Sequence, residues 1–295
     1  MNMGVRRKLA GYATIAIMLW PFAIQAQTTS TVEIVMPEPV SSSTKQYVSA
    51  IVMDADTKKV LFEDDADKVW SAASLTKLMT AMVFLQYRPS WTKIVSIKSV
   101  DEVGGGRLRV NSGATMNIKD LMYCAISASA NNTAMALARV TGLKRSTFVS
   151  YMNKKALALG LKKTHFVEPS GMDPKNVTTA REMALLARTA FTINDIRLPA
   201  TTASYRFMIR NTKEIKTLKN TNDLLIADEY EDVHVTGGKT GFIYESMYNL
   251  AVRLKPTDTT KKLPNLMIVV FGAPSRAASF ASAKTLADQA WQEYR

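Results

Sequence analysis

Strand patterns lie at both ends of this chain, and helical patterns fill the region between them. Near the N-terminus, the segment YVSAIVMDADTKKVLFEDDADK predicts a hairpin of two strands around a turn at DADTKK. Three further strands are predicted at 235–242, 247–254 and 266–272. Apolar residues at helical spacing predict one helix that carries Leu75, Leu78 and Met79, and others at 117–128, 131–141, 146–159, 178–193 and about 275–294. This order favours a single sheet in which the two ends of the chain meet, flanked by a helical lobe.

The first residues have the pattern of a secretory signal peptide. Arg6, Arg7 and Lys8 precede the apolar run LAGYATIAIMLWPFAI, and Ala26 offers a small residue for cleavage. Ile24 at the −3 position is less favourable for cleavage than alanine, so a retained anchor stays an alternative. Either form predicts export across the cytoplasmic membrane to the periplasm or cell envelope. The chain is expected to consist of a signal peptide at 1–26, a linker at 27–45 that is rich in Ser, Thr and Pro, and one folded domain at 46–295.

Charge and cysteine content narrow the classes of partner and chemistry. The formal net charge is +13 at pH 7, which favours anionic lipid head groups or an acidic wall polymer. Nucleic acid is not expected as a partner, because the sequence has no long Lys/Arg run and no motif of stacking aromatic residues. With Cys124 as its one cysteine and His165 and His234 as its two histidines, the chain is expected to hold no disulfide, metal or cofactor. Catalysis by Ser, Lys, Asp or Glu is favoured.

A serine and a lysine three residues apart form the first candidate site. Ser74 and Lys77 would lie on one face of a helix, with Ser74 in the first turn, where backbone N–H groups favour negative charge. Lys77 could take the proton of Ser74 if burial or a second cation lowered its pKa. The same spacing occurs at Ser42/Lys45 in the linker and at Ser90/Lys93 after a proline, neither with a rigid support. Taken alone, a capping serine beside an exposed lysine is the simpler interpretation.

Two further motifs favour a catalytic role for Ser74 and Lys77 over the simpler interpretation. ISASANNTA contains Ser129 and Asn131 in a break between two predicted helices. VTGGKTGFIYES contains the tripeptide Lys239–Gly241 in a predicted strand, where glycines allow a substrate to approach the strand edge.

The three motifs, in this order, resemble those of the penicillin-binding proteins and serine β-lactamases. Over roughly 45–290, segments such as VWSAASLTKLMTAMV and THFVEPSGMDPKNVTTAREMALLAR look more narrowly like the low-molecular-mass D-alanyl-D-alanine peptidases. The resemblance implies an α/β (α+β) fold of the serine β-lactamase and D,D-peptidase type, with an antiparallel sheet flanked by helices and a helical lobe. It also implies that 46–295 is the catalytic domain.

The resemblance also implies a role for each motif residue. Ser74 would be the acylated nucleophile, Lys77 its general base, and Ser129 a shuttle that passes a proton to the leaving amine. Asn131 would bind the substrate amide, and Lys239, Thr240 and Gly241 the substrate's terminal end, while Lys239 could instead keep Lys77 deprotonated. The N–H groups of Ser74 and Phe242 would form the oxyanion hole.

Two features leave alternatives open. After Gly241 the chain has Ile243 and Ser246-Met247 where the family usually has Thr and Ala-Gly, which places substrate preference in question. Glu168 falls where a β-lactamase would hold a glutamate that activates the deacylating water, although FVEPSGM matches the peptidase pattern, in which Glu168 is a structural carboxylate of the loop.

The implied function is that of a serine D,D-peptidase, an endopeptidase or a carboxypeptidase, which cuts D-alanyl bonds of peptidoglycan stem peptides through an acyl-enzyme. β-Lactam antibiotics would be covalent inhibitors, and peripheral membrane association is a further expectation. With no second β-rich domain and no amphipathic anchor in the sequence, the small endopeptidase branch is favoured. A β-lactamase and a non-catalytic β-lactam or peptidoglycan binding module are the alternatives.

Overall fold

The central element of the fold is a five-stranded antiparallel sheet with the strand order β2-β1-β11-β10-β9. The computed structural model describes residues 45–230, 232–257, 260 and 262–294, so the predicted signal peptide lies outside it. The sheet strands are β1 (Ser49–Asp54), β2 (Val60–Asp64), β9 (His234–Ile243), β10 (Met247–Lys255) and β11 (Leu266–Ala273). Because β1 pairs with β11, from Ser49 opposite Phe271 to Asp54 opposite Leu266, the prediction that the two ends of the domain meet in one sheet is confirmed.

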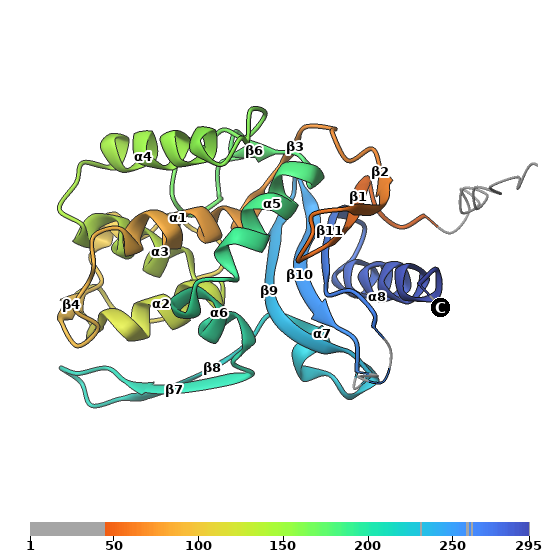
Figure 1. The fold of residues 1–295 in the computed structure, drawn as a ribbon. Coiled ribbons are helices and arrows are strands. Elements are labelled where there is room, and N and C mark those ends of the chain that lie inside the picture. Colours follow the sequence, from red (N-terminus) through yellow and green to blue (C-terminus); the bar gives the residue numbers. More distant parts are fainter. Residues whose placement is uncertain (1–44, 231, 258–259, 261, 295) are drawn as a thin grey trace, which may run out of the picture. The chain divides into compact units, whose positions relative to one another are not determined.

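The sheet is apolar on both faces because helices cover both. Figure 1 shows α8 (Arg276–Gln292) on one face and α5 (Ala180–Ala190) on the other. In β1 the side chains alternate between two cores: Ile51 belongs to the core shared with the helical lobe, and Val52 to the core under α8. A strand buried on both faces is apolar along its length, as β1 and β11 are.

The helical lobe is built around α1 (Thr76–Leu85), whose residues are buried from Thr76 to Phe84. A helix that is buried on every side packs at the centre of a lobe, and it carries Lys77 into the interior with it. The other helices of the lobe agree with the predicted ones to within about three residues at each end. They are α2 (Ile118–Ile126), α3 (Asn131–Val140) and α4 (Arg145–Ala158), with α5 between this lobe and the sheet.

Some elements were not predicted from the sequence, and all of them are short. The largest is a hairpin of β7 (Ser204–Met208) and β8 (Ile215–Lys219), held to the lobe where Tyr205 stacks on Tyr123 at a ring distance of 3.8 Å. Helix α6 (Asn194–Thr201) was not predicted because it contains Pro199, and a proline in a sequence usually indicates a loop or a helix end. The remaining ones are β3 (Trp70–Ser71), β4 (Ile94–Ser96), β5 (Thr115–Asn117), β6 (Val177–Thr178), α7 (Asp223–Ile226) and single 3-10 turns at Ala73–Leu75, Ser99–Asp101 and Asp228–Tyr230.

Within the described residues, no helix is both long enough and apolar enough to cross a membrane.

Candidate active site

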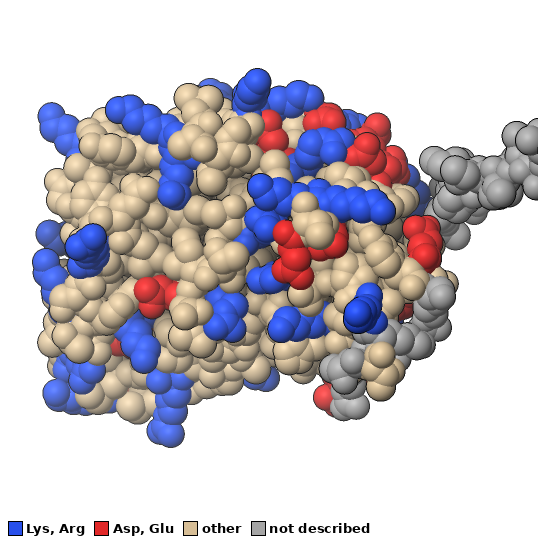
Figure 2. All heavy atoms as spheres, in the orientation of Figure 1, with Lys and Arg blue, Asp and Glu red and all other residues tan. Residues whose placement is uncertain are grey.

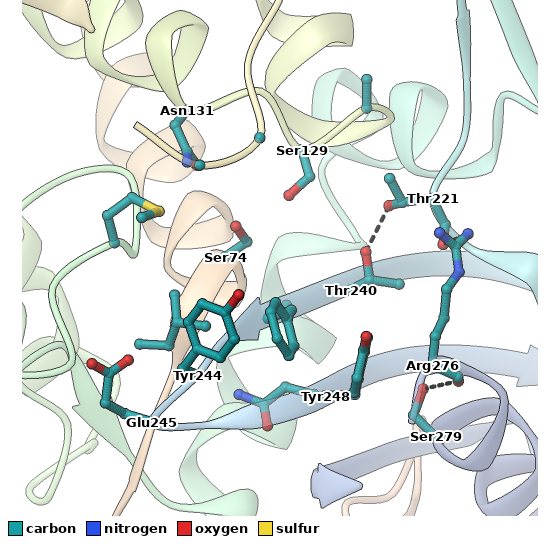
Figure 3. A pocket seen from close by; sticks show the side chains of 18 residues that line it. Ser74, Ser129, Asn131, Thr221, Thr240, Tyr244, Glu245, Tyr248, Arg276 and Ser279 are labelled. Atoms are coloured by element: carbon teal, nitrogen blue, oxygen red, sulfur yellow. Dashed lines mark hydrogen bonds between the residues drawn. The ribbon is translucent and has the colours of Figure 1, made fainter. Parts of the chain in front are cut away.

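A cavity of about 510 Å³ opens between the helical lobe and the edge strand β9. Ser74, Ser129 and Asn131 line it from the lobe, and Thr240–Phe242 line it from the strand (Figure 3). The structure therefore brings the three sequence motifs together at one place, although they are far apart in the chain.

Ser74 was predicted in the first turn of an α-helix, but it lies in the 3-10 turn Ala73–Leu75, two residues before α1 begins at Thr76. The residue before it, Ala73, has a φ of +46°, in the left-handed region that costs a non-glycine residue about 1–2 kcal/mol. Strand β9 passes so close that a Cβ on Gly241 would lie 3.2 Å from the Ser74 nitrogen. A side chain at this position would therefore press on the backbone of the turn that holds Ser74.

Lys77 points its amine at Ser74 from inside the lobe, where the residue is only 1% exposed. Its Nζ lies 2.7 Å from the Ser74 Oγ, and it also donates hydrogen bonds of 2.6 Å to the Asn131 Oδ1 and 2.6 Å to the Ser170 carbonyl. The last two oxygens can only accept. A neutral amine that donates to both of them has its lone pair left for Ser74, so the arrangement orients Lys77 as a base.

Burial lowers the pKa of Lys77 from 10.5 to about 7, with Glu168 acting in the opposite direction through its negative charge. An amine with a pKa near 7 is largely neutral at slightly alkaline pH and can accept a proton there.

Asn131 connects Lys77 to the glycine-rich loop on the other side of the cavity. Its Nδ2 donates to the Gly104 carbonyl at 2.9 Å, which turns its Oδ1 toward Lys77, and its backbone N–H donates to Gly106 at 2.8 Å. The motif asparagine thus positions the amine of Lys77 as well as lining the cavity.

Lys239 forms a second buried contact between a lysine and a serine, on the opposite wall. Its Nζ donates to the Ser129 Oγ at 2.7 Å and to the Thr240 carbonyl at 2.8 Å. Burial, and secondarily the charge of Lys77, hold the pKa of Lys239 well below its usual range. Ser129 has a φ of +59° in the break between α2 and α3, which confirms that this serine lies outside both helices. Asn131, predicted to lie in the same break, is instead the first residue of α3.

The loop that carries Glu168 packs beneath the nucleophile. The Glu168 carboxylate accepts hydrogen bonds from the backbone N–H groups of Ser170, Gly171 and Met172 and from the Asn176 Nδ2. Both carboxylate oxygens are therefore engaged within the loop. This shape presents the Ser170 carbonyl to Lys77, a contact that residue types alone could not reveal.

The hairpin turn after Gly241 departs from the family pattern and shapes one end of the cavity. Ile243 and Ser246 are buried. The Ser246 hydroxyl donates to the Met247 carbonyl at 3.0 Å and accepts from the Ile243 N–H, and the Trp70 Nε1 donates to the Ser246 carbonyl at 3.0 Å. Met247 adopts a φ of +54°, the conformation that glycine prefers. Ile243, Tyr244 and Glu245 line the cavity, whereas Ser246 and Met247 do not.

The residues at the two ends of the cavity were not predicted from the sequence: Tyr244 and Glu245 lie at one end, and Thr221 and Arg276 at the other (Figure 3). Arg276 begins α8 and is held by Asp223, to which its Nε and Nη2 donate at 2.8 and 2.6 Å. The Thr240 Oγ lies 2.6 Å from that of Thr221 (Figure 3). No motif signals Thr221 and Arg276, which reach the cavity through tertiary contacts, whereas Tyr244 and Glu245 could have been found because they follow the Lys239–Gly241 motif closely in the chain.

Residues 37–275 match the family described as D-alanyl-D-alanine carboxypeptidase. Two similar proteins are the D-alanyl-D-alanine endopeptidase of Pseudomonas aeruginosa, 33% identical over 81% of this chain and 75% of its own, and that of Escherichia coli, 32% identical over 92% and 85%. The carboxypeptidase DacF of Bacillus subtilis is 28% identical over 98% of this chain and 72% of its own. Among solved structures, the Streptomyces K15 DD-transpeptidase superposes with a TM-score of 0.73 at 25% identity, over 84% of this chain and 96% of that one. These likenesses confirm the predicted fold class.

Proposed function

The chain belongs to the D-alanyl-D-alanine carboxypeptidase family, and from that premise we propose that it cuts D-alanyl bonds of peptidoglycan stem peptides with Ser74 as the nucleophile. The observation that carries this proposal is the geometry of Lys77. Its amine faces the Ser74 hydroxyl at 2.7 Å, and its other two partners are oxygens that can only accept. A surface lysine beside a capping serine would show neither burial nor this set of partners.

In the proposed acylation step, Lys77 takes the proton of Ser74 while the Ser74 Oγ attacks the D-alanyl carbonyl carbon. The N–H groups of Ser74 and Phe242 stabilise the oxyanion, which is consistent with the close approach of β9 to the turn that holds Ser74. When the C–N bond breaks, the proton that Lys77 took from Ser74 passes through the Ser129 hydroxyl to the leaving amine, which leaves Lys77 neutral again. The Ser129 hydroxyl is held by Lys239 at 2.7 Å. Water then attacks the ester with Lys77 again as base, which releases the acid and restores Ser74.

The terminal carboxylate of the substrate would bind at the Thr240 end of the cavity. Thr240 and Thr221 supply hydroxyl groups there, and the guanidinium of Arg276 supplies positive charge. Buried Lys239 adds a second source of positive potential behind the strand when it is protonated.

Endopeptidase action on D-alanyl cross-links is the finer assignment that we favour. The support is similarity over the whole length of the relatives: the match covers 75% and 85% of the two endopeptidases, whereas the carboxypeptidase DacC of Escherichia coli, 31% identical, is covered over only 59% of its length. Purified cross-linked and uncrosslinked wall fragments, offered in separate reactions, distinguish the two activities by their products.

Rapid deacylation, as in a β-lactamase, finds little support in the geometry of Glu168. Its oxygens accept hydrogen bonds from Ser170, Gly171, Met172 and Asn176, so they are committed to shaping the loop. A carboxylate that activates water needs an oxygen available to that water.

A fluorescent penicillin, followed over time on a denaturing gel, tests the proposal. We expect a label that persists for many minutes on the wild-type protein, is absent in Ser74→Ala and is unchanged in Ser90→Ala, the serine of a decoy motif. Label that survives in Ser74→Ala would contradict the assignment of the nucleophile. Rapid loss of label as the drug is consumed would favour the β-lactamase, and no label on the folded wild type would favour a binding module.

We further propose that residues 1–26, which lie outside the described residues, direct export, with action on the wall from the periplasmic side. On the face drawn in Figure 2, basic side chains are spread over the helical lobe, whereas acidic ones gather mainly toward the sheet. Exposed Arg206, Lys213 and Lys219 of the β7–β8 hairpin add to this basic character, which suits an anionic wall polymer or membrane surface. N-terminal sequencing of the envelope protein tests cleavage after Ala26, and co-sedimentation with anionic vesicles at two salt concentrations tests membrane association.

A further inference from the structure

The cavity has a guanidinium at one end and a carboxylate at the other, with the nucleophile between them. Arg276, which is paired with Asp223, lies at one end and Glu245 at the other, and Ser74 lies between the two in Figure 3. Among the described residues, no Lys or Arg forms an ion pair with Glu245. A carboxylate that faces a cavity without a protein partner in a strongly basic protein is available to a cation from outside.

Aromatic rings accompany this carboxylate. Tyr244 is 87% exposed, and Phe242, between Tyr244 and Tyr248, is 40% exposed. The Phe242 ring centroid lies 5.6 Å from that of Tyr244 and 4.5 Å from that of Tyr248, so the three form a continuous aromatic wall. Exposed aromatic faces beside a carboxylate attract ammonium groups through cation–π and ionic contacts.

Hydrogen bonds of Ser246 fix the turn that carries Tyr244 and Glu245. The side chain of Ser246 bonds within the turn, and the Trp70 indole donates to the Ser246 carbonyl from β3. Tyr244 and Glu245 are therefore exposed side chains on an anchored backbone, which limits the ordering that a ligand would have to impose.

The direction of a bound peptide follows from the proposed function. If the terminal carboxylate binds at Thr240 and Arg276, and the scissile carbonyl at Ser74, the acyl-donor part of the peptide extends toward Tyr244 and Glu245. The residue that precedes the acylating D-alanine then lies nearest to this end of the cavity.

We propose that Tyr244 and Glu245 form a specificity subsite for a primary ammonium group on the side chain of the acyl-donor peptide, at the residue before the D-alanine. This inference rests on the proposed function for the direction of the peptide. The preferred substrate class is then a bipolar peptide, with a carboxylate toward Arg276 and an ammonium group toward Glu245.

The test compares two peptides that end in Lys-D-Ala-D-Ala and differ only in whether the lysine side chain is free or acetylated. Binding is measured by calorimetry on the Ser74→Ala protein, so that the result does not depend on turnover. We expect the free amine to bind about five- to tenfold more tightly at low salt, which is the effect of one exposed ionic and cation–π contact. Adding Glu245→Gln should bring the two affinities to within about twofold, without changing that of the acetylated peptide.

A matched control is Glu293→Gln, an exposed carboxylate at the far end of α8, about 25 Å along the helix from Arg276. This control should keep the full preference, and Tyr244→Ala should lose part of it. Equal affinities in the parent protein, or a preference that survives Glu245→Gln, would overturn the subsite. Penicillin labelling of the parent enzyme with Ser74 intact, and of Glu293→Gln in that background, would show separately that Ser74 reacts, so a failed subsite remains distinguishable from a failed function.

Discussion

The Nζ of Lys77 lies 2.7 Å from the Oγ of Ser74, and this contact is fixed by what surrounds the lysine. The Asn131 Oδ1 and the Ser170 carbonyl accept hydrogen bonds from the Lys77 amine, and Lys77 is almost completely buried. The orientation of a neutral amine toward the serine is thus built into the resting structure, and two segments distant in sequence are needed to maintain it.

The rate of acylation by penicillin should depend on pH through Lys77. Burial lowers the pKa of this amine to about 7, and only the neutral form can accept the proton of Ser74. Above that pH the rate should approach a plateau, and below it the rate should fall about tenfold per pH unit, as the amine becomes protonated. Stopped-flow acylation rates between pH 5.5 and 9 measure this directly, and a rate that does not change across this range would contradict Lys77 as the base.

Replacement of Glu168 by glutamine should move this acid limb to lower pH. The negative charge of Glu168 raises the pKa of Lys77, so its removal should lower that pKa and keep the amine neutral at more acidic pH. The variant should also lose about 2–4 kcal/mol of unfolding free energy, because a carboxylate accepts the backbone N–H groups of Ser170, Gly171 and Met172 better than an amide can.

The matched control is Glu182→Gln. Glu182 is also a largely buried carboxylate that accepts hydrogen bonds, from the Lys163 backbone and the Thr164 hydroxyl, but its charge does not contribute to the pKa shift of Lys77. It should lower stability and leave the acid limb in place. If both variants shifted the limb equally, loss of stability rather than the charge of Glu168 would be the cause.

The sequence could predict the motif side chains of the site but not its backbone contacts. Ser74, Lys77, Ser129 and Lys239 belong to short motifs, and the structure brings these motifs to one cavity. The Ser170 carbonyl could not be predicted, because every residue has a carbonyl and only the folded loop selects this one.

The fold shows the same division between strong local patterns and tertiary contacts. The strands near the C-terminal end were predicted to within one residue at each end, and the long periodic helices to within about three. The β7–β8 hairpin has only five residues in each strand and is held by the stacking of Tyr205 on Tyr123, so its local signal is weak. Arg276 was not predicted as a site residue for a related reason. It lies at the start of α8, and the apolar pattern of α8 indicates only how that helix packs on the sheet, not that its first residue reaches the cavity.

Gly171→Ala should strongly reduce both stability and acylation. Gly171 has a φ of +87°, and a Cβ there would lie 1.9 Å from the Ala73 carbonyl oxygen, beside the nucleophile turn. Because that neighbour is backbone, the turn itself must move, and we expect a loss of about 3 kcal/mol or more and at least a tenfold slower acylation.

Gly142→Ala separates the conformational cost from the clash. Gly142 has a similar φ of +82°, but a Cβ added there would meet no other atom within 4 Å, so the variant should lose only about 1 kcal/mol and acylate normally. Urea unfolding and acylation rates for both variants provide the comparison. Equal losses of stability and acylation rate in the two variants would mean that the clash with Ala73 does not explain the effect of Gly171→Ala.

Met247→Gly should stabilise the protein. Met247 holds a φ of +54°, which costs a residue with a Cβ about 1–2 kcal/mol, and the added freedom of glycine in the unfolded chain offsets part of that cost. A gain of about 0.5–1 kcal/mol in urea unfolding is therefore expected. Lys213→Gly is the matched control, because Lys213 has a φ of +61° in the β7–β8 turn, where the chain does not line the cavity. A gain at Lys213 together with a loss at Met247 would contradict this prediction. It would show that the methionine side chain stabilises the hairpin by more than its backbone conformation costs. The departure from glycine would then stabilise the hairpin that carries Tyr244 and Glu245.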